Sequence, residues 1–255
     1  MRRNLLTSTA LTTSTTLLTG ATWAADMAVK APPVPVAAPL FWNACYAGLN
    51  AGGAWVNLHQ QVTVPGITVI DSSGTTGAFL GGGQIGCNWQ RDPSWVFGLE
   101  GDIDYVSAKR ANNFAFISGG EDVVGQQSTK LRWLSTLRAR FGYVWGGSLV
   151  YGTGGLAIGE IQSCASAIQS FNGTVVNQFS GCDPTWRGGW TLGAGIEHAF
   201  SDKVSVKLEY LYFDLGHVGY NVITPNHDIA FPQVWNASAG ATGNIIRLGI
   251  NFKFN

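Results

Sequence analysis

Two carboxylates and two arginines occupy alternate positions in otherwise apolar runs of this sequence. Glu100 and Asp102 lie in one run, and Arg138 and Arg140 lie in another. Two closely spaced carboxylates could act as the acid and the base of a catalytic site. Because one antiparallel register would let Glu100 face Arg140 and Asp102 face Arg138, we favour ion pairing over catalysis.

Further charged residues follow the same alternation, and the acids and bases in these runs are equal in number. Glu197 and Lys207 would lie opposite each other if the chain turns about residue 202. Buried ions must be paired, because taking a lone ion out of water costs several kcal/mol. The balance therefore predicts an ion-pair network in a protein interior. Its members are Glu100, Asp102, Asp104, Arg138, Arg140, Glu197, Lys207, Glu209, Arg247 and Lys253.

Other residues that often carry chemistry do not form a recognisable site. His198 ends an apolar run, and we interpret it as a replacement for an interfacial aromatic residue rather than as the base of a hydrolase. His59, His217 and His227 fall in predicted loops, without a Cys, Asp or Glu at ligand spacing. The glycines of 152–155 lack the Lys and Ser/Thr of a phosphate loop. The sequence therefore predicts no catalytic residue, no cofactor and no metal.

Composition limits the class of protein that holds these residues. The 255 residues are 45% hydrophobic and 12% charged, and 15 Lys and Arg balance 15 Asp and Glu. Such a neutral chain is unsuited to nucleic acid, because binding to phosphates requires an excess of Lys and Arg. No apolar stretch reaches the roughly 18 residues of a transmembrane helix.

Eight runs alternate with a period of two, which is typical of β-strands. The runs are 45–55, 82–90, 95–105, 135–143, 149–159, 190–199, 204–212 and 246–254. Short turns at 91–94, 146–147 and 201–203 follow every second run. Long polar stretches follow the others, at about 56–75, 106–129, 160–187 and 216–243. The regular alternation of short turns with long polar connections predicts an all-β fold. The expected architecture is an eight-stranded antiparallel up-and-down transmembrane β-barrel with short periplasmic turns and four long extracellular loops.

The two faces of the runs differ in chemistry. One face carries the charges and many glycines, and the other carries Leu, Ile, Val and Phe, with Trp and Tyr near the run ends. The second pattern predicts a lipid-facing belt with aromatic girdles. A soluble sheet with its charges in water would not need equal numbers of acids and bases. Eight strands enclose a space that side chains can fill, so we expect a sealed lumen.

The start of the sequence predicts export. Arg2 and Arg3 precede a mildly apolar stretch and then small residues, which indicates a secretory signal peptide over 1–24. A Pro-rich periplasmic spacer over 25–41 follows, because its prolines disfavour helix and ladder. The barrel occupies 42–255.

Export also makes the four cysteines interpretable, because disulfides persist outside the cytosol. Cys164 and Cys182 share one polar stretch, and Cys45 and Cys87 lie in two successive strand-like runs. Four cysteines permit three pairings. Pairing 164 with 182 and 45 with 87 is a preference among these alternatives.

Several sequence blocks occur in order along nearly the whole chain. They include GGGQIGCNWQ (81–90), FGLEGDI (97–103), LRARFGYVW (137–145), GWTLGAGIEHAF (189–200) and NIIRLGINFKF (244–254). Together they resemble the small outer-membrane barrels of alphaproteobacteria, the porin-family outer-membrane immunogenic proteins with an OmpA-like fold. The resemblance implies a non-enzymatic integral protein of the bacterial outer membrane that acts as a surface antigen.

From these observations we expect a structural role in the cell envelope. The alternative is a narrow porin-like channel for the slow diffusion of small solutes. The expected partners are outer-membrane lipid, lipopolysaccharide and the outer-membrane assembly machinery. Peptidoglycan or a host surface is a further candidate contact, and no nucleic acid is expected.

Overall fold

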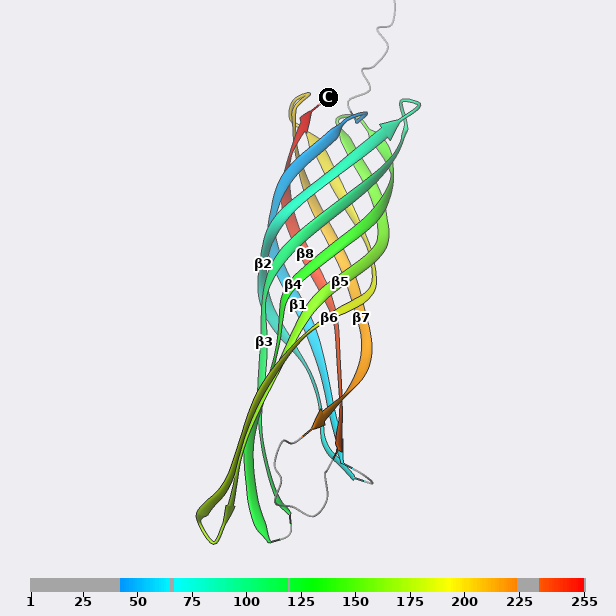
Figure 1. The fold of residues 1–255 in the computed structure, drawn as a ribbon. Helices are drawn as coiled ribbons and strands as arrows, with labels where there is room; N and C mark the ends of the chain where they lie inside the picture. Colours follow the sequence, from blue (N-terminus) through cyan, green and yellow to red (C-terminus); the bar gives the residue numbers. More distant parts are fainter. Residues whose placement is uncertain (1–41, 65–66, 119, 224–233, 255) are drawn as a thin grey trace, which may run out of the picture. The chain divides into compact units, whose positions relative to one another are not determined.

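The computed structural model describes residues 42–254, apart from 65–66, 119 and 224–233. The predicted signal peptide and spacer lie outside this part of the chain. Eight antiparallel strands close into a barrel in sequence order, with β1 paired to β8, and the predicted fold class is confirmed (Figure 1). The strands are β1 (Cys45–Val64), β2 (Ile67–Gln90), β3 (Trp95–Ser118), β4 (Glu121–Trp145), β5 (Ser148–Phe171), β6 (Thr174–Ala199), β7 (Val204–Ile223) and β8 (Val234–Phe254).

Tight turns join the strands at one end of the barrel, where the sequence predicts them. Between β4 and β5, Gly146 has a φ of +59°, a conformation that glycine adopts without strain. Between β2 and β3, the Asp92 carboxylate accepts hydrogen bonds from the backbone N–H groups of Ser94 and Trp95. These local interactions reverse the chain within a few residues.

The four polar stretches that were predicted to be loops are largely strand. The β5–β6 ladder, for example, continues to Phe171, which pairs with Thr174. Strand pairing persists because a hairpin satisfies its backbone hydrogen bonds whatever the polarity of its side chains. His59 and His217 therefore lie on β1 and β7 and not in loops. His227 lies outside the described residues.

The fully closed section of the barrel is shorter than the strands. Within the described residues, β2 pairs with β3 over Leu80–Gln90, and β6 pairs with β7 over Trp190–Ala199. Each ladder is near the roughly 9–11 residues with which a tilted strand crosses a bilayer. Past this section the strands continue as two groups, β3 to β6 and β7–β8–β1–β2, away from the tight turns (Figure 1).

Alternation along the strands places apolar side chains on the outer wall and the charged ones inside. Leu156 on the outer wall is 63% exposed, whereas Glu100 and Arg138 on the inner wall are at most 1% exposed. Inner-wall glycines allow neighbouring strands to approach closely. A Cβ on Gly155 would lie 2.1 Å from the carbonyl oxygen of Leu137. No helix in the described part of the chain is long and apolar enough to cross a membrane.

Candidate functional site

Arg138 on β4 is the centre of the interior charge network. Its guanidinium lies 2.5 Å from Glu100, 2.8 Å from Asp102 and 3.0 Å from Glu209. Its Nε also donates to the Thr136 hydroxyl at 2.9 Å. All four charged side chains are fully buried, so these charge-assisted bonds replace the water that each ion has lost.

Arg247 reaches the same carboxylates from β8. It lies 2.8 Å from Asp102, 2.6 Å from Asp104 and 2.7 Å from Glu209. Since β3 and β8 are not neighbours in the barrel, the bonds to Asp102 and Asp104 cross the lumen. The interior at this level is therefore occupied by interlocked side chains.

Arg140 and Lys207 extend the network toward the tight turns. Arg140 lies 2.6 Å from Glu197 on β6 and 3.3 Å from Glu100 on β3. Its guanidinium also stacks over the Tyr151 ring, 3.9 Å from the ring centre. The Lys207 ammonium is 2.7 Å from Glu100. Four cations and five carboxylates on β3, β4, β6, β7 and β8 thus form one connected set.

The β3–β4 register differs by two residues from the predicted one. Glu100 lies opposite Arg138, and not opposite Arg140. The predicted pairs Glu100–Arg140 and Asp102–Arg138 are still in contact, but diagonally. Long side chains reach the next inward position along a neighbouring strand, which is why the charges pair despite the shifted register.

The β6–β7 register agrees with the prediction, because Glu197 lies opposite Lys207. The two residues nevertheless make short contacts with other partners, Glu197 with Arg140 and Lys207 with Glu100. Lys253, the tenth predicted member of the network, has its ammonium 4.2 Å from the centre of the Trp42 ring. Nine of the ten predicted residues are members of the connected set described above.

Neutral side chains that the sequence analysis did not identify complete the network. The Tyr46 hydroxyl donates to Glu100 at 2.5 Å, and the Tyr151 hydroxyl donates to Glu209 at 3.0 Å. Both tyrosines are almost fully buried. The alternation of the strands could have identified them. Tyr46, for example, lies two residues before the inward-facing Gly48, and residues two apart on a strand point to the same face.

A second, apolar layer lies beside the charges, on the side away from the tight turns. The expectation of an interior filled by ion pairs alone is therefore incomplete. On β7, Leu211, Phe213 and Leu215 follow Glu209 at successive inward positions, and all three are about 1% exposed. The layer comprises Ala54, Val56, Leu58, Leu80, Val106, Ala108, Leu131, Leu134, Ala157, Ile161, Leu211, Phe213, Leu215, Ala241 and Ile245. An apolar layer of this kind opposes the passage of water and ions.

The outer wall is apolar along the closed section, and it carries aromatic residues at both ends. Trp89, Trp95 and Tyr143 lie exposed near the tight turns, and Trp55 and Tyr105 lie exposed at the other end of the section. Two such girdles separated by an apolar band are typical of a wall that faces lipid.

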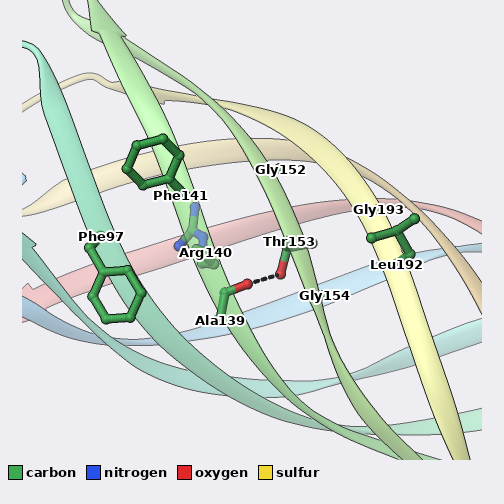
Figure 2. A pocket seen from close by; sticks show the side chains of 9 residues that line it. All are labelled: Phe97, Ala139, Arg140, Phe141, Gly152, Thr153, Gly154, Leu192 and Gly193. Atoms are coloured by element: carbon green, nitrogen blue, oxygen red, sulfur yellow. Dashed lines mark hydrogen bonds between the residues drawn. The ribbon is translucent and has the colours of Figure 1, made fainter.

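A shallow groove interrupts this wall where two glycines replace side chains. Figure 2 shows Phe97, Phe141 and Leu192 around Gly152 and Gly154. Arg140 also lines the groove, but its guanidinium pairs with Glu197 and Glu100 inside the barrel. We therefore treat the groove as part of the lipid-facing wall.

His198 lies on the outer wall near the tight turns. Its ring packs edge-on against Phe200 with ring centres 4.9 Å apart, and its Nδ1 is 2.9 Å from the Ser148 hydroxyl. A hydrolytic Ser–His pair needs an acid that orients the imidazole. Among the described residues, no carboxylate is hydrogen-bonded to His198.

The two disulfides of the structure join the cysteines in the preferred pairing. Cys45 and Cys87 join directly opposed positions of β1 and β2 near the tight turns. Cys164 and Cys182 join opposed positions of β5 and β6, outside the closed section. The second disulfide adds a covalent link between two strands that are hydrogen-bonded to each other beyond the closed section.

Known proteins share this sequence along most of its length. Residues 24–254 match the family described as outer membrane protein beta-barrel domain. A 31 kDa outer-membrane immunogenic protein of Brucella melitensis biotype 1 is 34% identical over 250 residues, covering 91% of this chain and 92% of that protein. A 25 kDa outer-membrane immunogenic protein of Brucella abortus biovar 1 is 30% identical over 236 residues, covering 91% and 90%. Among solved structures, the outer membrane protease OmpT from Escherichia coli is 9% identical with a TM-score of 0.47, covering 84% of this chain and 97% of that chain.

Proposed function

This chain belongs to the outer membrane protein beta-barrel domain family and is an outer-membrane protein, and we propose that its main role is structural. In this proposal the closed section anchors the protein in the bilayer, and the tight turns face the periplasm. The extended strand groups project from the cell surface. The barrel stabilises the envelope and does not conduct solutes.

The observation that carries the proposal is the set of ion pairs that cross the lumen. Lys207 on β7 contacts Glu100 on β3, and Arg140 on β4 contacts Glu197 on β6. Neither pair joins neighbouring strands, so each holds two parts of the wall together. Breaking one such pair leaves a buried ion uncompensated, at a cost of about 3–5 kcal/mol. A solute would have to break these pairs and also cross the apolar layer around Phe213.

A surface-antigen role rests on the strand groups beyond the closed section. The Brucella relatives are named as immunogenic proteins. In this chain the β5–β6 hairpin continues to Phe171 and is joined by the disulfide between Cys164 and Cys182. A stiff, covalently joined hairpin presents one lasting shape to an antibody. This role requires no catalysis.

Single-channel recording on the purified protein in planar bilayers tests the sealed barrel. The proposal predicts no stable conductance steps, either for the wild type or for Phe213→Ala, because the ion-pair layer still blocks the lumen in that variant. Large, stable and voltage-independent steps from the wild-type protein would favour the porin-like alternative.

Deleting the gene tests the envelope role. We expect the deletion strain to become more sensitive to detergent and to release more vesicles, and the wild-type gene to restore both properties. Normal detergent resistance and vesicle release in the deletion strain would contradict a structural role.

A further inference from the structure

Two histidines from distant parts of the sequence meet on the outer face of the barrel. His59 on β1 and His217 on β7 both lie opposite Gly240 of β8, one on each side of that strand. Their ring centres are 5.4 Å apart, and the ring planes are tilted by 53°. The pair exists because three strands hold a common register, and neither imidazole is close to the other in the sequence.

Gly240 allows the two rings to approach across β8. A Cβ at this position would lie 2.7 Å from Cδ2 and 3.0 Å from Nε2 of His217. Any larger residue would therefore push the His217 ring away from its present place. The surrounding ladder thus holds the two imidazoles side by side over a bare stretch of backbone.

The separation of the rings matches that of two imidazoles on one zinc ion. With Zn–N bonds of about 2.0 Å and ring centres about 1.1 Å behind each nitrogen, a tetrahedral angle places the centres about 5 Å apart. A right angle, as in octahedral or square-planar complexes, gives about 4.4 Å by the same construction. The observed 5.4 Å is closer to the tetrahedral value.

The histidines lie where a metal ion from solution can reach them. His59 is four residues beyond Trp55, an exposed member of the aromatic girdle on the same face of β1. His217 follows Asp214, where the β6–β7 ladder and the closed section end. His217 is exposed and His59 is partly exposed. The pair therefore lies just outside the bilayer thickness, next to water.

We propose that His59 and His217 bind one Zn²⁺ ion, with water in its remaining positions. In the part of the chain that the structure describes, no third His, Cys, Asp or Glu joins the pair. The site is thus an open two-imidazole site on the surface of the barrel. Bound zinc would tie β1 to β7 across β8 and stabilise the sheet where it leaves the bilayer.

The test uses the full-length barrel, purified without a polyhistidine tag and freed of metal by a chelator. Zn²⁺ binding is measured by titration calorimetry and by metal analysis after gel filtration. We expect one Zn²⁺ per chain in the wild type, and loss of this ion in His59→Ala and in His217→Ala. His198→Ala, which changes a histidine at the opposite end of the barrel, is the matched control and should keep the ion. Zn²⁺ should also raise the unfolding temperature of the wild type and of His198→Ala, but not of the other two variants.

Two results would overturn the proposal. One is wild-type protein that binds no stoichiometric zinc at micromolar concentrations. The other is zinc that binds equally to His59→Ala and His217→Ala. Each variant must migrate as a folded barrel on an unheated gel, so that a loss of zinc reports the site and not the fold.

Discussion

Replacing Arg138 with Ala tests whether the buried charges depend on one another. Arg138 contacts three carboxylates, those of Glu100, Asp102 and Glu209, and all of them are fully buried. The substitution removes one of four cations in the network and leaves three to balance five carboxylates. It also opens a space in a region that water does not reach.

The expected loss of stability follows from the number of partners. Removing one member of a buried ion pair costs about 3–5 kcal/mol, because its partner remains as an uncompensated buried ion. Since Arg138 serves three carboxylates, we expect a loss at the upper end of this range. Adding Glu100→Gln should recover part of it, because the double variant has one uncompensated carboxylate fewer.

The free energy of unfolding is measured on the refolded barrel in detergent, by tryptophan fluorescence in urea. The temperature at which gel mobility changes reports the thermal stability of the same barrel. Arg132→Ala is the matched control, because Arg132 lies on the same strand but is exposed, at the irregularity between Leu131 and Trp133. The control should stay within about 0.5 kcal/mol of the wild type. An Arg138→Ala barrel as stable as the control would refute the reasoning.

The remaining predictions concern the apolar layer, the inner-wall glycines and the outer disulfide. Phe213→Ala should lower the free energy of unfolding by about 3–5 kcal/mol, because the ring is fully buried among other apolar side chains, and urea titration measures this loss. Gly155→Ala should destabilise the barrel by about 1–3 kcal/mol, since its Cβ would overlap the neighbouring strand. Gly53→Ala is the control and should fold as the wild type does, because the nearest atom to its Cβ would be 4.0 Å away. Equal refolding yields for Gly155→Ala and Gly53→Ala would contradict the close approach of the strands at Gly155. Cys164→Ser should increase protease cleavage of the β5–β6 hairpin while the heat-modifiable gel shift persists, because Cys164 and Cys182 lie outside the closed section.

The sequence predicts the fold well because the determining signals are local. The strict alternation around Glu100 and Arg138 identifies strands and separates their two faces. Turn residues such as Gly146 mark the hairpins at one end. The equal number of acids and bases indicates that the charged face is the interior. None of these inferences requires knowledge of which residue contacts which.

The interior could not be predicted in detail because it depends on long-range register. A shift of two residues between β3 and β4 exchanges the partners of Glu100 without changing the face on which it lies. The apolar layer was not predicted because most of its residues, such as Leu131 and Phe213, lie beyond the runs whose alternation identifies strands. The pairing of His59 with His217 depends on three strands at once, and no local pattern reports it.

A double-mutant cycle tests most directly whether ion pairs across the lumen hold the barrel wall together. Arg140→Met and Glu197→Gln, singly and together, isolate a pair 2.6 Å apart on the non-adjacent strands β4 and β6. For a close buried pair we predict a coupling free energy of more than about 1.5 kcal/mol. A coupling near zero would show that these two charges do not hold the wall together, and it would contradict the structural account of the interior.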